Sequence, residues 1–298
     1  MNKTLIIYHR VDWDGYTSAA IAYMANPTSD FLGWNYGDTL PDVTNYEQVI
    51  LVDLTISDRN DYTWMHNHAD KLIWIDHHMN AVHSVNRPDV KGLRRNDIGA
   101  CMLTWEYFFP NQPVHQHVSL CATYDVFRKD GKYATWDDAW KYQLVLGEYG
   151  PGWTKEEGDI SCFLVGLARD FIKEQDNATS SRLLRGDMLE KQRADKEAEL
   201  FKHAEYNTID GVTYCILYAV GQPAMLIKSH LDNYAADAFL IVNPDPLPNG
   251  DYKVSVRVPE ISNFDASAFC RQYGGNGHIK AAGCAMSEEQ INSYKFVK

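Results

Sequence analysis

Apolar and polar positions alternate in blocks over the first part of the chain. Three short apolar segments have the length and the branched side chains of buried strands, namely 5–8, 49–52 and 72–75. Mixed segments at 16–24 and 98–109 have a helical pattern, and Asp97 precedes the second as a candidate N-cap. Strands that alternate with helices predict an α/β fold, in which a mostly parallel sheet is covered by helices on both faces.

The pattern changes in the second half of the chain. A helical block at 160–173 leads through a polar stretch into segment 181–204, where Glu, Lys, Arg and Leu dominate. Such a charged stretch is typical of a solvated helix face, and we expect this one to connect two domains. Beyond it, three segments have the composition of strands: 212–218, 238–242 and 252–258. They predict a smaller C-terminal α/β domain.

The length of 298 residues and the hydrophobic content of 45% suit a globular protein with two domains that each have a core. We expect an N-terminal domain at 1–175, a connector helix at 176–206 and a C-terminal domain at 207–298. The six cysteines are scattered without a CxxC pair, which argues against a zinc ribbon and a disulfide scaffold.

The sequence also limits the partners of the protein. No signal-peptide pattern opens the chain, and no apolar run approaches the roughly 20 residues that cross a bilayer, so we expect a cytoplasmic protein without a membrane partner. The formal net charge of −12 repels polyanions, and a long nucleic-acid track is therefore not expected. A phosphate group would be bound locally, by metal ions and a few basic side chains. The sequence leaves open whether the chain forms a homo-oligomer.

Each of the three N-terminal apolar segments ends in residues of the kinds that bind metals. These residues are His9, Asp12 and Asp14 after the first segment, Asp53 after the second, and Asp76, His77 and His78 after the third. Because the carboxyl ends of parallel strands meet at one edge of a sheet, these side chains should converge there. Carboxylates with some imidazole suit Mn²⁺, Mg²⁺ or Fe²⁺ better than structural zinc, so we expect manganese first and magnesium second.

Taken singly, these residues also have ordinary interpretations. His9 is typical of a half-buried histidine, Asp14 of a helix N-cap, and Asp53 of a turn at a strand end. Gly15 is expected to permit a tight turn before the first helix. Together, however, the residues favour two adjacent metal ions. Such a pair shares a bridging carboxylate and lowers the pKa of a bridging water, so that the water is present as hydroxide. The two ions also clamp the attacking and leaving oxygens of a phosphoryl displacement, which suits hydrolysis of a phosphate ester.

The order His-x-x-Asp-x-Asp-Gly, Asp and Asp-His-His, followed by Asp125 in Ala-Thr-Tyr-Asp, resembles the DHH family of phosphoesterases. This resemblance implies a two-manganese site in which Asp53 bridges the ions. One ion would be held by His9, Asp12 and Asp53, and the other by Asp14, Asp53, His77 and Asp125. Asp76 would orient the histidines, and His78 would face the substrate phosphate or assist the leaving group. These two are therefore the expected catalytic residues.

A glycine-rich segment, Gly-Gly-Asn-Gly-His at 274–278, lies near the end of the chain. The backbone N–H groups of such a loop can cradle an anion, although a plain turn before 279–286 is an ordinary alternative. Together with Arg257 and a following Ala-Ala-Gly, the segment resembles the domain commonly attached to DHH proteins. Compared with the familiar Gly-Gly-Gly-His loop, it has either one residue more or Asn276 in a glycine position. The resemblance implies substrate binding by Arg257, Gly274, Gly275, Gly277 and His278.

The resemblance spans nearly the whole chain and implies an enzyme of the superfamily that includes nano-RNases, pAp phosphatases and RecJ-like proteins. Such an enzyme would be a manganese-dependent phosphodiesterase or phosphatase. Its substrates would be short oligonucleotides, cyclic dinucleotide products or 3′-phosphoadenosine 5′-phosphate. Two other hypotheses stay open, namely a non-enzymatic nucleotide-binding module and an inorganic pyrophosphatase. The sequence does not fix the particular nucleotide, the choice between RNA and DNA, or the direction of cleavage.

Overall fold

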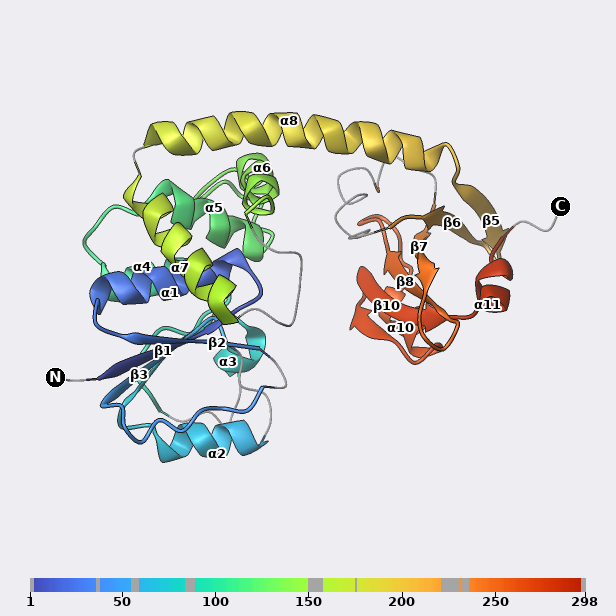
Figure 1. Ribbon diagram of the computed structural model, residues 1–298. Helices are drawn as coiled ribbons and strands as arrows, with labels where there is room; N and C mark the ends of the chain where they lie inside the picture. The colour runs from blue at the N-terminus through green and yellow to red at the C-terminus, as the bar shows by residue number, and fades with distance from the viewer. Residues whose placement is uncertain are drawn as a thin grey trace. The chain divides into compact units, whose positions relative to one another are not determined.

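The computed structural model divides into two compact units, Met1–Glu190 (unit 1) and Lys191–Lys298 (unit 2), each with its own sheet (Figure 1). The structure describes residues 3–35, 38–54, 59–83, 89–149, 158–174, 176–220, 231 and 236–295. None of the helices in these ranges combines the length and the apolar character of a membrane span.

The sheet of unit 1 has four parallel strands in the order β2-β1-β3-β4. The strands are β1 (Thr4–His9), β2 (Asp30–Trp34), β3 (Gln48–Val52) and β4 (Leu72–Ile75). The structure confirms the predicted parallel sheet. Strand β2 was not expected from the sequence, because it begins with Asp30 and contains Gly33, both of which are uncommon in strands.

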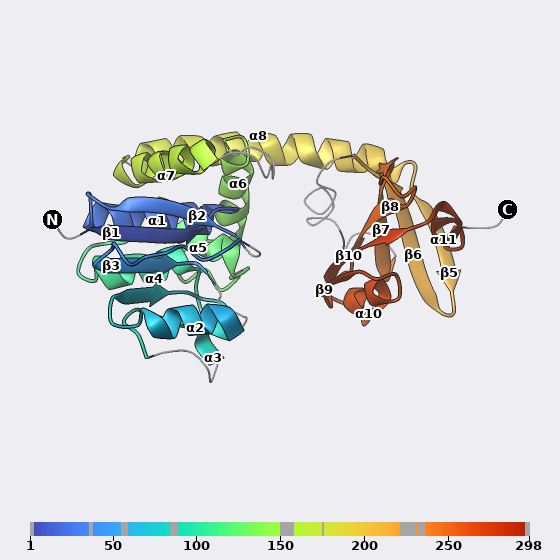
Figure 2. The same cartoon turned by 60° about the horizontal axis from the view of Figure 1, so that its bottom comes forward.

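Helices cover both faces of this sheet, as predicted (Figures 1 and 2). One face packs against five helices: α1 (Trp13–Ala25), α4 (Ala100–Phe108), α5 (Gln116–Asp125), α6 (Trp136–Leu146) and α7 (Gly158–Lys173). The other face packs against α2 (Arg59–Asn67) and α3 (Met79–His83). In β1, Ile6 and Tyr8 join the first core, whereas Leu5 and Ile7 join the second. A strand buried on both faces explains the continuous apolar run in the sequence.

The start of α4 differs from the sequence-based expectation. Gly99, and not Asp97, is the N-cap of this helix, and it makes no side-chain cap hydrogen bond. Asp97 instead accepts a hydrogen bond from Nε of Arg95 at 2.7 Å. The first N–H groups of α4 are bonded by a side chain from α1, which a local reading of the sequence does not reveal.

Helix α8 (Asp176–Phe201) is 26 residues long and runs from unit 1 into unit 2. The charged segment at 181–204 falls largely within this helix, and the polar stretch before Ser181 is helical as well. Its last turn is partly buried, and Leu200 and Phe201 pack against the core of unit 2. The predicted domain boundaries at 175/176 and 206/207 stay predictions.

The sheet of unit 2 has six strands in the order β5-β6-β7-β8-β10-β9. They are β5 (Glu205–Ile209), β6 (Val212–Tyr218), β7 (Ala238–Pro246), β8 (Tyr252–Arg257), β9 (Asn276–His278) and β10 (Ala281–Met286). Only the pair β6–β7 is parallel among these described strands. Helices α10 (Ala266–Arg271) and α11 (Glu288–Asn292) contribute to one core, on one face of the sheet. The predicted smaller α/β domain is thus confirmed.

Candidate metal centre

The strand order of unit 1 places a topological switch point between β1 and β3. Strand β1 is followed along the chain by β2 on one side of it, and then by β3 on its other side. Tyr8 and Val52 are partners in the parallel register, so His9 and Asp53 follow at neighbouring strand ends. The crevice outside such a switch point is where α/β sheets bind their ligands.

The loop from β1 into α1 supplies three of the predicted ligands. His9 is the last residue of β1, and Asp12 is the N-cap of α1. Oδ1 of Asp12 accepts a hydrogen bond from the Gly15 N–H at 2.9 Å. The other oxygen of Asp12, Oδ2, lies 2.9 Å from Nδ1 of His9. Asp14 follows within the first turn of α1 and is buried. The capping role considered for Asp14 in α1 therefore belongs to Asp12.

Gly15 has a different role from the one expected. It lies inside α1, and a Cβ atom at this position would stand 2.0 Å from the carbonyl oxygen of His9. The absence of a side chain thus permits the helix to approach the end of β1 closely, and a tight turn is not the reason for this glycine. This contact helps to keep His9 and the helix N-terminus together.

Asp53 occupies the centre of the site. Its backbone is left-handed, with φ of 56°, which aspartate tolerates better than most residues. Its N–H donates to the carbonyl oxygen of Ile75 at 3.0 Å, which fixes the turn after β3. The buried carboxylate has one oxygen toward each histidine: Oδ2 lies 3.6 Å from Nδ1 of His9, and Oδ1 lies 3.4 Å from Nε2 of His77.

His77 faces three carboxylates. Its Nε2 lies 3.0 Å from Oδ2 of Asp125, 3.4 Å from Oδ1 of Asp53 and 3.9 Å from Oδ2 of Asp14. Asp125 is the last residue of α5, so a helix that is distant in the sequence delivers this group to the edge of the sheet. The structure therefore brings together all six residues predicted as metal ligands.

Asp14 is held by the N-terminus of α4, a contact that the sequence analysis missed. Its Oδ2 accepts from the Ala100 N–H at 2.6 Å, and its Oδ1 accepts from the Cys101 N–H at 2.8 Å. A Cβ atom on Gly99 would stand 3.0 and 3.1 Å from the two oxygens and 2.9 Å from Cα of Ala122. Gly99 thus leaves the space in which Asp14 meets α4. In the sequence, only the two adjacent small residues Gly99 and Ala100 at the start of a helix indicate that another group packs closely there.

Asp76 orients both histidines of the Asp-His-His segment. It is fully buried, and its Oδ1 accepts from the N–H groups of His77 at 2.8 Å and His78 at 3.3 Å. The same oxygen lies 2.7 Å from Nδ1 of His78. Because Nδ1 is engaged, only Nε2 of His78 is left to face another group. His78 is also the more exposed of the two histidines.

The pKa values reflect the charge of the cluster. Burial lowers the pKa of His9, but hydrogen bonds and charges of Asp12 and Asp53 outweigh burial and raise it to about 11. Burial also lowers the pKa of His77, and neighbouring carboxylates again raise it overall. The pKa of Asp53 is raised, first by burial and then by the charges of Asp12 and Asp14. The clustered carboxylates thus favour positive charge at this edge of the sheet.

The residues present fit divalent metal ions. Three groups of described residues have suitable ligand atoms close together. Within each group, every residue offers one ligand atom, and these atoms all lie within 4.8 Å of one another. The groups are Asp53, Asp76, His77 and His78; His9, Asp12 and Asp53; and Asp14, His77 and Asp125. Oδ1 of Asp53 is buried without a hydrogen-bond donor in the described part of the chain. A buried carboxylate oxygen without a donor is costly, and a cation would satisfy it.

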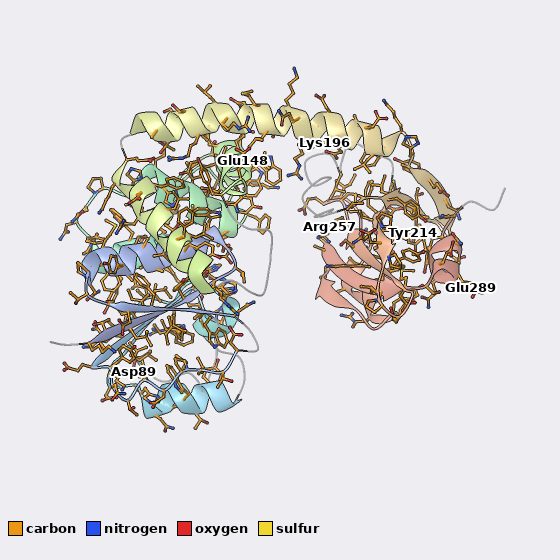
Figure 3. The ribbon with its side chains drawn as sticks, in the orientation of Figure 1. Asp89, Glu148, Lys196, Tyr214, Arg257 and Glu289 are labelled. Carbon is orange, nitrogen blue, oxygen red and sulfur yellow. The ribbon has the colours of Figure 1, made fainter. Side chains whose placement is uncertain are left out.

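The residues predicted to bind substrate lie in unit 2. Arg257 ends β8, where its Nη1 donates to the carbonyl oxygen of Val256 at 2.8 Å and burial lowers its pKa (Figure 3). Gly274 has φ of 70°, and a Cβ on Gly275 would stand 2.2 Å from the carbonyl oxygen of Gly283.

The expected glycine-rich loop is in part a strand. The backbones of Gly277 and His278 belong to β9, which pairs with β10, whereas the side chain of His278 lies outside what the structure describes. The binding roles of Arg257 and of these loop residues stay predictions.

Comparison with known proteins gives a family and a fold. Residues 3–123 match the family described as DHH family, N-terminal domain. No curated protein matches the sequence. A pGpG-specific phosphodiesterase, PggH from Vibrio cholerae, is similar in structure, with a TM-score of 0.56, 12% identity and coverage of 98% of this chain and 95% of that chain.

Two further structures share the fold. RecJ from Thermus thermophilus, in complex with Mn²⁺, has a TM-score of 0.51 and 16% identity over 98% of this chain and 50% of that chain. CDC45 from Entamoeba histolytica has a TM-score of 0.50 and 7% identity over 98% of this chain and 94% of that chain. At these identities the likeness concerns the fold. Residues 3–123, which are less than half of the chain, match the N-terminal domain of the DHH family.

Proposed function

We propose that this chain is a metal-dependent phosphoesterase that hydrolyses phosphate esters of small nucleotides, with short oligonucleotides as the first substrate class. One observation carries the proposal. Asp53 directs one carboxylate oxygen toward His9 and the other toward His77, and each of these imidazoles faces further carboxylates. This arrangement suits two cation positions that share one bridging carboxylate.

These contacts support the proposed ligand sets of the two positions. His9, Asp12 and Asp53 would hold one ion, and Asp14, Asp53, His77 and Asp125 would hold the other. When bound, such a pair supplies a water of lowered pKa and a clamp on the phosphoryl oxygens. Mn²⁺ is the first ion to test and Mg²⁺ the second, because carboxylates with imidazole suit both and RecJ has been crystallised with each.

The chain's own residues orient the reacting groups. Asp76 fixes the ring of His78 through Nδ1, so Nε2 of His78 is free to meet the substrate phosphate or to donate a proton to the leaving oxygen. Asp76 also holds the backbone of His77, which keeps Nε2 of His77 among the carboxylates. In unit 2, Arg257 and the segment from Gly274 to His278 are proposed to bind substrate phosphates.

Size and charge favour a small substrate. The net charge of −12 opposes the many phosphate contacts that hold a long strand. The Vibrio protein of this fold is named a pGpG-specific phosphodiesterase, which makes a linear dinucleotide the first compound to test. We propose that the reaction takes place in the cytoplasm, where such nucleotides arise.

The experiment uses the full chain stripped with a chelator and reloaded with Mn²⁺ or Mg²⁺. We expect release of nucleoside monophosphate from dinucleotides and trinucleotides, which ion-exchange chromatography resolves. Asp53→Asn should reduce the rate by roughly 10²–10³-fold or more. Asp89→Asn is the matched control, because Asp89 is exposed and lies toward the amino end of β4, where Ile73 pairs with Lys91 (Figure 3).

Other outcomes would contradict the proposal. Rapid hydrolysis of inorganic pyrophosphate, with none of nucleotides, would identify a pyrophosphatase. Tight binding of nucleotides without turnover under either metal would identify a binding module.

A further inference from the structure

Directly beyond α5, an aromatic residue has an unusual backbone conformation. Phe127 has φ of 53°. The N–H of Arg128 donates to the carbonyl oxygen of Thr123 at 3.0 Å, and the N–H of Phe127 donates to the carbonyl oxygen of Tyr124 at 3.1 Å. This is the Schellman pattern of a helix end, in which the left-handed residue is usually glycine. Phe127 thus stands where a side chain is least favoured.

Burial does not explain the choice of phenylalanine. The side chain of Phe127 is 54% exposed, so it gains much less from leaving water than a core aromatic does. A bulky residue with positive φ is an outlier, and backbone outliers of this kind cluster at functional sites.

Phe127 is the most exposed ring of a group of four described aromatic residues. Tyr124 and Trp136 stack at 5.8 Å with an interplanar angle of 4°, and Trp140 lies on Tyr124 at 6.2 Å and 27°. The ring of Phe127 lies 5.6 Å from Trp136 at 30° and 6.2 Å from Tyr124 at 34°. Exposure decreases from Phe127 to half-buried Tyr124 and Trp136 and to buried Trp140. The inner rings support the outer one.

The aromatic group adjoins the metal centre. Tyr124 and Phe127 flank Asp125, whose carboxylate lies 3.0 Å from His77. Two residues of backbone span at most about 7 Å, so Cα of Phe127 lies within that distance of Cα of Asp125, a predicted metal ligand. The ribose of a nucleotide separates its phosphate from its base by a comparable span, so a base whose phosphate lies at the metal centre is within reach of Phe127.

We propose that Phe127 stacks on the nucleobase of the substrate whose phosphate lies at the metal centre. The inference rests on the proposed function, because it supplies the base contact for that reaction. Every nucleobase has a π-face, so a stacking site tolerates different bases. The protein should therefore accept purine and pyrimidine nucleotides and should bind base-free phosphates much more weakly.

The test compares Phe127→Gly with the wild type in the Mn²⁺-loaded full chain. Glycine suits this backbone, so the melting temperature should be unchanged or higher. Affinity for guanosine monophosphate should fall about tenfold or more, because one base–aromatic stack corresponds to roughly 5- to 150-fold. Affinity for ribose 5-phosphate should not change. Phe127→Trp should restore nucleotide binding, and Phe163→Ala, at an exposed phenylalanine of α7, should have no effect.

The readouts separate this inference from the proposed function. With dinucleotides, Phe127→Gly should raise KM more than it lowers kcat. If the wild type turns over no ester but binds guanosine monophosphate through Phe127, the hydrolase proposal fails and the stacking site stands. Equal nucleotide affinity in the variant and the wild type would overturn the stacking site, as would an equal loss for ribose 5-phosphate.

Discussion

The two units of this protein bury very different side chains, although both are built on apolar strands. In unit 1, the buried aspartates and histidines among the described residues are His9, Asp14, Asp53, Asp76 and His117. In the described part of unit 2, the buried polar residues are Glu197, Ser262 and Ser267. Buried carboxylates cost stability unless a cation or donor meets them. Unit 1 therefore concentrates this cost at the edge of its sheet, whereas the one buried carboxylate among the described residues of unit 2, Glu197, lies on α8.

Two histidines within unit 1 show what decides the charge of a buried group. His117 is fully buried, and burial lowers its pKa to about 3. Its ring nitrogens lie 3.0 Å from the Thr17 hydroxyl and 2.8 Å from the Tyr142 hydroxyl, which are neutral partners. His9 is almost as buried, yet carboxylates raise its pKa. The partners, and not burial alone, thus distinguish a structural histidine from one at the candidate metal centre.

Two helix caps offer the largest expected contrast between the units. Asp12 in unit 1 and Asp265 in unit 2 each accept a backbone N–H hydrogen bond at 2.9 Å, from Gly15 and Ala268 respectively. Serine caps a helix about as well as aspartate does, so both Asp→Ser variants should fold. Asp12→Ser should weaken Mn²⁺ binding by more than about 100-fold. Even residues that only hydrogen-bond to a metal ligand change metal affinity by about 10–100-fold when they are replaced.

Titration calorimetry on chelator-stripped protein measures this contrast. Asp265→Ser is the matched control and should bind Mn²⁺ as the wild type does. Equal Mn²⁺ affinities for the two variants would show that the carboxylate of Asp12 is not a ligand.

Gly99→Ala should have an intermediate effect. The added methyl group would crowd both oxygens of Asp14 and Cα of Ala122, so Asp14 should shift relative to α4. We expect Mn²⁺ affinity and the rate of ester hydrolysis to fall about tenfold, in the range of changes to groups that orient ligands. Gly166→Ala in α7 is the control, because a Cβ there meets nothing within 4 Å. Wild-type Mn²⁺ affinity in Gly99→Ala would exclude this positioning role.

The smallest expected effect concerns pH. Because the pKa of His9 is raised to about 11, its contribution to stability is complete below about pH 6.5 and is lost as the pH rises toward 11. The raised pKa of Asp53 acts in the same direction, since its contribution is lost as the pH rises above 3.8. Metal-free unit 1 should therefore be less stable at about pH 8 than at about pH 6, and Mn²⁺ should stabilise it more at the higher pH.

Two measurements check the pH dependence. The increase in Tm on adding Mn²⁺ should be larger at about pH 8 by roughly 2–4 °C. Hydrogen exchange should assign the change to β3 of unit 1, with β7 of unit 2 as the internal reference. A Mn²⁺ effect that does not depend on pH, or one that appears equally in β7, would contradict the charge difference between the units.

The errors of the sequence analysis have a common physical cause. Asp97 was expected to cap α4, but that end is bonded by Asp14, which is 86 residues away from Ala100 in the sequence. Gly15 was assigned to a turn, whereas a long-range steric contact requires it. Phe127 was not singled out, because its signal is a left-handed backbone that the sequence does not display. The first two errors concern long-range contacts, and the third concerns a backbone conformation that local preference disfavours.

The three apolar runs of unit 1 and the predicted metal ligands that end them can be identified in the sequence alone. A strand buried on both faces needs a continuous apolar run, and parallel strands necessarily end at one edge, so local patterns suffice for that much. How these groups meet depends on the packed unit, in which Asp53 lies between His9 and His77 and α5 carries Asp125 to His77. These positions depend on how helices pack across the sheet, and packing is a property of the whole unit.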